Sequence, residues 1–183
     1  MFKFAFIENV PGSSPENYSF VYENDESYSL VTGTSSFEMT EELIKKLDKE
    51  GYDLIDLCGD FGEEAAAKLE ESVTGKMEIT YADYLPDELA KIEALDSLKE
   101  YGIVIVMDGV EETQKFSLKS EECNTYVHFV KDLDAAKVAA KELVEQQGVY
   151  FLELCSYFDK KETLEVIAAI EGKVPVGSCG DLK

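Results

Sequence analysis

The chain has 183 residues, of which 45% are hydrophobic and 31% charged, a composition typical of a globular protein rather than a disordered one. Its 39 acidic residues outnumber its 17 basic residues, which gives a formal net charge of −22. Such a surface repels phosphate backbones and anionic lipid headgroups, so we expect neither nucleic acid nor a membrane as a partner.

The N-terminal residues MFKFAFIENV are apolar but brief, and they lack the long apolar region and the cleavage site of a signal peptide. The longest apolar runs, such as IVIVM at 103–107, are far too short to span a bilayer. We therefore expect the N-terminal segment to form a first strand, and the protein to be cytoplasmic.

The first half of the chain predicts strands that alternate with helices. Short apolar or β-branched runs predict four strands, at 4–8, 28–32, 54–58 and 77–82. Apolar residues at helical spacing predict two helices, at 37–50 and 63–73. Ser35 or Ser36 can cap the first of these helices, and Gly51 is placed to end it.

The second half predicts the same order of elements. Its strands are expected near 102–107, 126–130, 150–155 and 173–178, and its helices near 133–147 and 160–171. Between the halves, Pro86 and the apolar spacing that follows it predict a connecting helix over 86–100. The expected organisation is a first α/β repeat at 1–84, a connecting helix at 85–100 and a second α/β repeat at 101–183.

The two halves are also related in sequence, at a separation of 97 positions. Comparison of residues 51–76 with 148–173 gives six identities in 26 positions, against about two expected by chance. The identical pairs are Gly51 and Gly148, Leu57 and Leu154, Cys58 and Cys155, Phe61 and Phe158, Gly75 and Gly172, and Lys76 and Lys173. The same separation places Phe6 on Ile103 and Leu47 on Val144, without a net insertion.

The fold expected from this pattern is α/β, with two tandem β-β-α-β-α-β repeats related by a pseudo-two-fold. Strands that alternate with helices through short loops favour right-handed crossovers and a mainly parallel sheet with flanking helices. A repeat of this size is marginally stable alone, because a short chain buries a small fraction of its surface.

The motifs of the first half resemble those of a small prokaryotic α/β family, domain-of-unknown-function family 6506. The resemblance rests on Ala5-Phe6-Ile7, the Pro-Gly-x-x-Pro-Glu loop at 11–16, the segment Ile55-Asp-Leu-Cys-Gly-Asp-Phe-Gly62, and Pro175-Val176-Gly177 in the second half. A typical member has about half the length of this chain, so the resemblance implies two units in tandem over nearly all of it. The family implies no activity.

Each copy departs from the family pattern at a different end. The second half has Ser-Tyr-Phe-Asp at 156–159 in place of the glycine-rich loop, and the first half has Glu78-Ile79-Thr80 in place of Pro-Val-Gly. A site composed of both repeats and a decayed second copy both remain open.

The candidate ligand site lies at the carboxyl ends of the strands, where parallel α/β sheets bind ligands. Its residues are Asp56, Cys58, Gly59, Asp60, Phe61 and Gly62 in the first repeat and Glu153 and Cys155 in the second. An acid inside an apolar strand has to be paired, hydrogen-bonded or exposed at a site. The same loop can also be a tight turn between strand and helix, and its acids disfavour phosphate.

The leading hypothesis is thus an uncharacterised protein that binds a small molecule at its strand ends. One alternative is a structural or protein-interaction module without catalysis. Another is a thiol- or metal-dependent enzyme centred on Cys155, Cys179 and His128, with Glu153 as a further ligand. The four cysteines lack a C-x-x-C pair, which argues against a disulfide framework and a zinc ribbon.

The sequence names no reaction and no cofactor. It contains no GxGxxG, no GKS or GKT and no GxSxG motif. Whether the chain forms a homo-oligomer is also left open.

Overall fold

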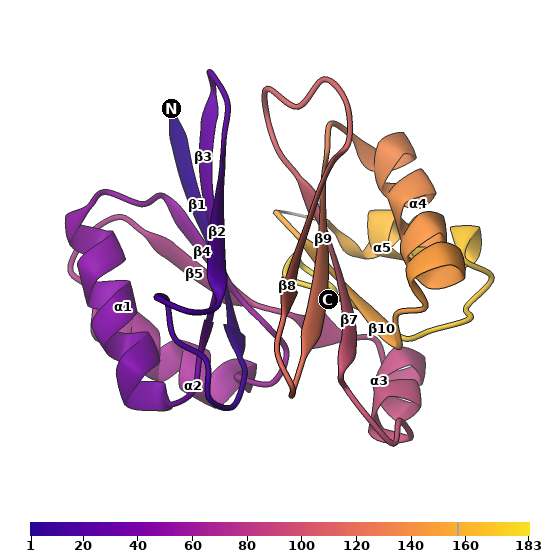
Figure 1. Cartoon of the computed structure of the whole chain (residues 1–183), viewed down its shortest axis with the longest axis horizontal. Helices are drawn as coiled ribbons and strands as arrows, with labels where there is room; N and C mark the ends of the chain where they lie inside the picture. Colours follow the sequence, from indigo (N-terminus) through magenta and orange to yellow (C-terminus); the bar gives the residue numbers. More distant parts are fainter. Residues whose placement is uncertain (157) are drawn as a thin grey trace. The chain divides into compact units, whose positions relative to one another are not determined.

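The computed structural model describes residues 1–156 and 158–183, which divide into two compact units, Met1–Tyr81 and Ala82–Lys183 (Figure 1). Tyr157, part of the segment that replaces the glycine-rich loop in the second repeat, lies outside the described residues. No helix in the described part of the chain has the length and hydrophobicity needed to cross a membrane.

The first unit is a five-stranded sheet with two helices. Its strands are β1 (Phe2–Asn9), β2 (Ser19–Glu23), β3 (Ser27–Thr34), β4 (Leu54–Leu57) and β5 (Glu78–Tyr81), and its helices are α1 (Phe37–Lys49) and α2 (Gly62–Glu70). The strand order is β2-β3-β1-β4-β5. All neighbours are parallel except β2 and β3, which form an antiparallel pair.

Both helices of the first unit cover the same face of its sheet (Figure 1). The chain crosses from β3 to β4 and then to β5 in one direction, so two right-handed crossovers place α1 and α2 on one side. The side chain of Ser36 caps α1 by accepting from the Met39 N–H, and Gly51 ends it at φ 75°. Between helices and sheet lies a core that includes Ile7, Ile44 and Leu57.

The second unit is a six-stranded sheet. Its strands are β6 (Asp83–Tyr84), β7 (Glu100–Val106), β8 (Gln114–Lys119), β9 (Asn124–Val130), β10 (Phe151–Cys155) and β11 (Val176–Ser178). Its helices are α3 (Pro86–Glu93), α4 (Leu133–Glu142), the π-helical segment η1 (Leu143–Gln147) and α5 (Lys160–Ala169). The order is β6-β11-β10-β7-β9-β8; β6 pairs antiparallel with β11 and β8 pairs antiparallel with β9, and the other neighbours in this order are parallel.

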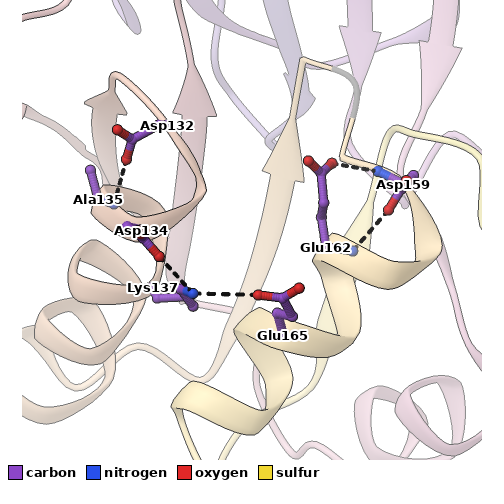
Figure 2. A network of polar contacts seen from close by, with 7 residues as sticks. All are labelled: Asp132, Asp134, Ala135, Lys137, Asp159, Glu162 and Glu165. Carbon is purple, nitrogen blue, oxygen red and sulfur yellow. Dashed lines mark hydrogen bonds and ion pairs between the residues drawn. The ribbon is translucent and has the colours of Figure 1, made fainter.

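The two crossover helices of this unit begin with side-chain caps (Figure 2). The carboxylate of Asp132 accepts the Ala135 N–H at 2.9 Å and starts α4. Asp159 and Glu162 form a reciprocal capping box that starts α5.

One lysine joins these helices. Lys137 of α4 lies 2.7 Å from an oxygen of Asp134 and 3.4 Å from an oxygen of Glu165 on α5 (Figure 2). The helices therefore lie side by side on one face of the second sheet, above a core that includes Val104, Leu152 and Leu154.

When β6 is set aside, the two sheets have the same strand order and the same strand directions. The expected α/β fold of two tandem, mainly parallel units is thereby confirmed. Besides the two-residue β6, which the sequence also did not predict, each unit contains one unpredicted strand, β2 in the first and β8 in the second. Both are half-exposed edge strands, so neither has the continuous apolar run by which the other strands were found.

The pairing register refines the alignment of the repeats. Phe4 pairs with Leu54 and Tyr101 with Phe151, so these strands keep the separation of 97. Along β3 and β9, however, Phe4 pairs with Ser29 and Tyr101 with Thr125, which is a separation of 125 − 29 = 96. The connection that follows the first strand of the repeat is therefore one residue shorter in the second unit.

The π-helical segment η1 restores the separation of 97. The caps Ser36 and Asp132 are 96 apart, whereas the C-terminal glycines Gly51 and Gly148 are 97 apart. Because a π-turn takes up one more residue than an α-turn, η1 absorbs the difference. The predicted match of Leu47 with Val144 is consequently wrong.

The structural counterpart of Leu47 is Leu143. Both leucines are buried, and their carbonyls accept the N–H that follows the C-terminal glycine, from Tyr52 at 3.1 Å and from Val149 at 3.3 Å.

Candidate functional site

The acid of the first repeat, Asp56, is on the face of β4 that points away from the helices. Ile55 and Leu57 enter the core beneath α1 and α2, and side chains alternate along a strand. Asp56 is 1% exposed. The hydroxyl of Thr80, directly opposite on β5, donates to the Asp56 carboxylate at 2.6 Å. This bond offsets part of the cost of burying the charge.

The loop after β4 is a tight turn. The Phe61 N–H donates to the carbonyl of Cys58 at 3.1 Å, which closes a turn over four residues, and Gly62 then adopts φ 68° at the start of α2. The backbone N–H of Asn9 donates to the Cys58 sulfur at 3.3 Å, and its side-chain amide donates to Asp60. The turn therefore joins the ends of β1 and β4.

The charge around this turn is negative. Asp60 precedes α2, and Glu63 and Glu64 occupy the first turn of the helix, so carboxylates already surround its positive end. The turn suits a cationic or neutral group better than a phosphate. Of the predicted loop residues, Gly59, Phe61 and Gly62 are half-buried and Asp60 is exposed.

The acid of the second repeat, Glu153, occupies the position equivalent to Asp56. It is 2% exposed and lies on the face of β10 opposite Leu152 and Leu154, which pack beneath the helices. Two tyrosines hold its carboxylate. The Tyr84 hydroxyl donates to one oxygen at 2.7 Å, and the Tyr101 hydroxyl donates to the other.

A glycine makes room for the first of these tyrosines. Gly177 pairs with Glu153, as Thr80 pairs with Asp56 in the first unit. A Cβ atom on Gly177 would lie 2.6 Å from the ring of Tyr84. In each compact unit a hydroxyl thus reaches the buried acid, directly from the next strand in the first unit and from Tyr84 above a glycine in the second. This explains why the second copy has a glycine at position 177.

Two thiols follow Glu153 at the carboxyl ends of neighbouring strands. Cys155 ends β10 and Cys179 follows β11, and their sulfurs are 3.6 Å apart. The Cys179 N–H donates to the Leu154 carbonyl at 2.9 Å, which continues the parallel pairing by one residue. Cys155 is fully buried and Cys179 is 7% exposed. Among the hypotheses drawn from the sequence, one alone groups Cys179 with Cys155, the one centred on both cysteines and His128, with Glu153 as a further ligand.

The grouping with His128 is wrong. His128 pairs with Val104, which packs beneath the helices, so its side chain is on the helical face of the second sheet. Glu153 and Cys155 are on the opposite face. His128 is 3% exposed and lies near the ion pair of Lys115 and Glu142. Burial lowers the pKa of His128 from 6.5 to about 4, so the imidazole is neutral at pH 7.

The polar partners of the two acids were missed by sequence reasoning. Thr80, Tyr84 and Tyr101 are ordinary β-rich residues in the sequence, and only strand register shows that they face a carboxylate. The sequence contained one signal: Thr80 and Gly177 occupy equivalent positions of the two copies, and an acid is present in both copies at the position opposite them.

A family model described as "Family of unknown function (DUF6506)" matches residues 2–97 and, a second time, residues 99–180. The chain belongs to this family and carries two tandem matches to its domain, which confirms the resemblance found in the sequence. No curated protein matches the chain. Among solved structures, it is similar to unliganded arylmalonate decarboxylase, with 13% identity and a TM-score of 0.33 over 98% of this chain and 88% of that chain.

Proposed function

We propose that the protein binds a small molecule at the carboxyl ends of its strands, and that the ligand carries an amine or another hydrogen-bond donor. One observation carries the proposal. In both repeats a buried carboxylate, Asp56 or Glu153, stands at the same place in the sheet, receives hydroxyl hydrogen bonds and precedes a cysteine by two residues. We assign no reaction to this arrangement.

The cost of burying these acids supports a functional role. An ionised carboxylate in an apolar strand destabilises a fold unless it is paired and hydrogen-bonded, and an apolar residue of similar volume is often at least as stable. The hydroxyl donors hold each carboxylate in one orientation. Such fixed acceptors suit the recognition of a donor group, because their orientation is set before the ligand arrives.

The charge distribution supports the choice of ligand. The chain has a net charge of −22, and Asp60, Glu63 and Glu64 surround the first turn of α2. An anionic ligand would meet repulsion here, whereas a protonated amine would be attracted. The loop residues Cys58, Gly59, Phe61 and Gly62 would then contact the uncharged part of the ligand in the first unit, as Cys155 would in the second.

We also propose that the protein is located in the cytoplasm of a prokaryote. Four reduced cysteines, all buried, suit a reducing compartment, where thiols persist without forming disulfides.

Thermal-shift measurements test the choice of ligand. Primary amines and amino alcohols are compared with carboxylic acids of the same carbon skeleton, each over a range of concentrations. We expect Tm to rise with amine concentration, since binding to the native state alone stabilises it. Equal shifts from amines and acids would contradict the proposal.

Variants test the site. Asp56→Asn and Glu153→Gln each remove a negative charge and keep the size of the side chain. Glu121→Gln removes the same charge from an exposed position and serves as the matched control. We expect the amine shift to fall in at least one of the two site variants and to stay unchanged in the control. If the shift persists in both site variants, the strand ends do not bind the ligand.

A further inference from the structure

We propose that Cys155 and Cys179 are a modification site, at which hydrogen peroxide converts the two thiols reversibly into an intramolecular disulfide. This inference does not depend on the proposed ligand. It rests on the position of the two sulfurs, which are both buried and lie 3.6 Å apart.

The strand pairing brings the cysteines into a geometry that a disulfide can adopt. Leu154 pairs with Ser178. The residue that follows each of them is a cysteine, Cys155 after Leu154 and Cys179 after Ser178, so the two cysteines are also opposite each other. Neighbouring strands are about 4.8 Å apart, within the range of Cα separations of about 4.4–6.8 Å found across disulfides. The sulfurs must approach by roughly 1.5 Å to reach a bond length of about 2.05 Å, which side-chain torsions can supply.

The other two cysteines are placed differently. The Cys58 sulfur accepts the N–H of Asn9 at 3.3 Å, and the Cys123 sulfur lies 3.5 Å from the hydroxyl of Thr125. Among the residues that the structure describes, Cys155 and Cys179 have their sulfurs in contact, so oxidation is expected to select this pair.

Exposure sets the order of the two steps. Cys179 is 7% exposed and Cys155 is fully buried, so peroxide reaches Cys179 first. The Cys179 thiol loses its proton, its sulfur attacks one peroxide oxygen, and the O–O bond breaks; the hydroxide that leaves takes up this proton, so that a sulfenic acid and one water form. The Cys155 sulfur then attacks the sulfenic sulfur, its proton and the hydroxyl leave as a second water, and the S–S bond forms. Overall, two thiols and one hydrogen peroxide give one disulfide and two waters.

The bond would close a loop between residues 24 positions apart. It would connect the end of β10, two residues after Glu153, to the C-terminal segment. That segment also holds the start of α5, because Asp181 accepts the Lys160 N–H at 3.0 Å. A cross-link here restricts the unfolded chain, so we expect the oxidised protein to melt at a higher temperature than the reduced protein.

Mass spectrometry of the full chain is the direct test. The reduced protein is treated with stoichiometric hydrogen peroxide, unfolded and alkylated. We expect a species that has lost two hydrogen atoms and takes up two alkyl groups instead of four. Trypsin should yield a linked pair made of the peptide that ends at Lys160 and the peptide that ends at Lys183, and dithiothreitol should separate them.

Variants distinguish the mechanism from general oxidation. Cys58→Ser and Cys123→Ser should leave the cross-link intact, whereas Cys155→Ser should halt the reaction at a sulfenic acid on Cys179 that dimedone traps. The proposal is overturned if the wild-type protein gives no linked peptide pair, a pair that includes Cys58 or Cys123, or only cross-links between molecules. The wild-type peptide map decides the matter even where a variant fails to fold.

Discussion

The neutral, buried histidine of the second sheet makes the stability of this protein depend on pH in a defined window. Burial lowers the pKa of His128 from 6.5 to about 4, Glu142 opposes that shift and Lys115 adds to it. Because the folded-state pKa is depressed, the stabilisation is fully present above the unfolded pKa of 6.5 and is lost as the pH falls towards 4. The unfolded chain takes up a proton in this window and the folded chain does not.

The size of the effect follows from the two pKa values. A shift of 2.5 units corresponds to about 3 kcal/mol when the pH is below both values, since one unit is about 1.4 kcal/mol. Near pH 5 the expected loss is about 2 kcal/mol, and most carboxylates are still ionised there. The side chain is 3% exposed, so solvent screening is small.

The perturbation is His128→Gln, which removes the titrating group. Urea unfolding followed by far-UV circular dichroism gives the free energy of unfolding of each protein at about pH 8 and pH 5. We expect the wild type to lose about 2 kcal/mol more than the variant between these values, because all other groups titrate alike in both. Parallel pH dependences of the two proteins would refute a depressed pKa at His128.

Three further changes test the strand register and the repeat. Thr80→Val removes the hydroxyl that donates to Asp56, and we expect a loss of about 2 kcal/mol in urea unfolding. Gly177→Ala places a Cβ against the Tyr84 ring, and we expect a loss of about 2 kcal/mol with a changed tyrosine fluorescence. Deletion of Gln146 from η1 should convert the π-turn to an α-turn and change stability by less than about 1 kcal/mol in thermal unfolding.

Two of these changes, Thr80→Val and the deletion of Gln146, have matched controls. Thr74→Val removes an exposed hydroxyl and should alter stability by less than about 0.5 kcal/mol. Deletion of Lys49 from α1, which has no residue to spare, should cost more than deletion of Gln146, because it displaces the C-terminal Gly51. If the two deletions reduced stability equally, η1 would not contain an inserted residue. A Thr80 variant as stable as its control would mean that the hydroxyl does not stabilise Asp56.

Much of the fold could be predicted because its central strands and helices have strong local patterns. The apolar runs of β1, β4, β7 and β10 are buried on both faces, and the caps and glycine stops of α1 and α4 are local signals. The edge strands β2 and β8 were missed because half-exposed strands mix polar and apolar residues. The π-turn was missed because a single added residue leaves the helical pattern on either side intact.

The candidate site was less predictable because its contacts depend on register. The alternation of side chains along a strand places Glu153 and Cys155 on the same face of β10. That Thr80 faces Asp56, or that Cys179 lies beside Cys155, depends on pairing between segments about 24 residues apart. The face on which His128 lies could not be predicted either. His128 and Tyr126 share one face of β9, but neither residue type indicates whether helices cover that face.

The short strand β6 has a consequence for the edge of the second sheet. Without β6, β11 would be the outermost strand of its sheet. The unpaired N–H and C=O groups of an outermost strand can pair with a strand of another chain. Tyr84 and Asp83 pair with Gly177 and Ser178, and Glu88 of α3 accepts the remaining N–H, from Val176, at 2.9 Å. The segment between the repeats thus covers the edge of β11, which a single repeat without this segment would leave unpaired.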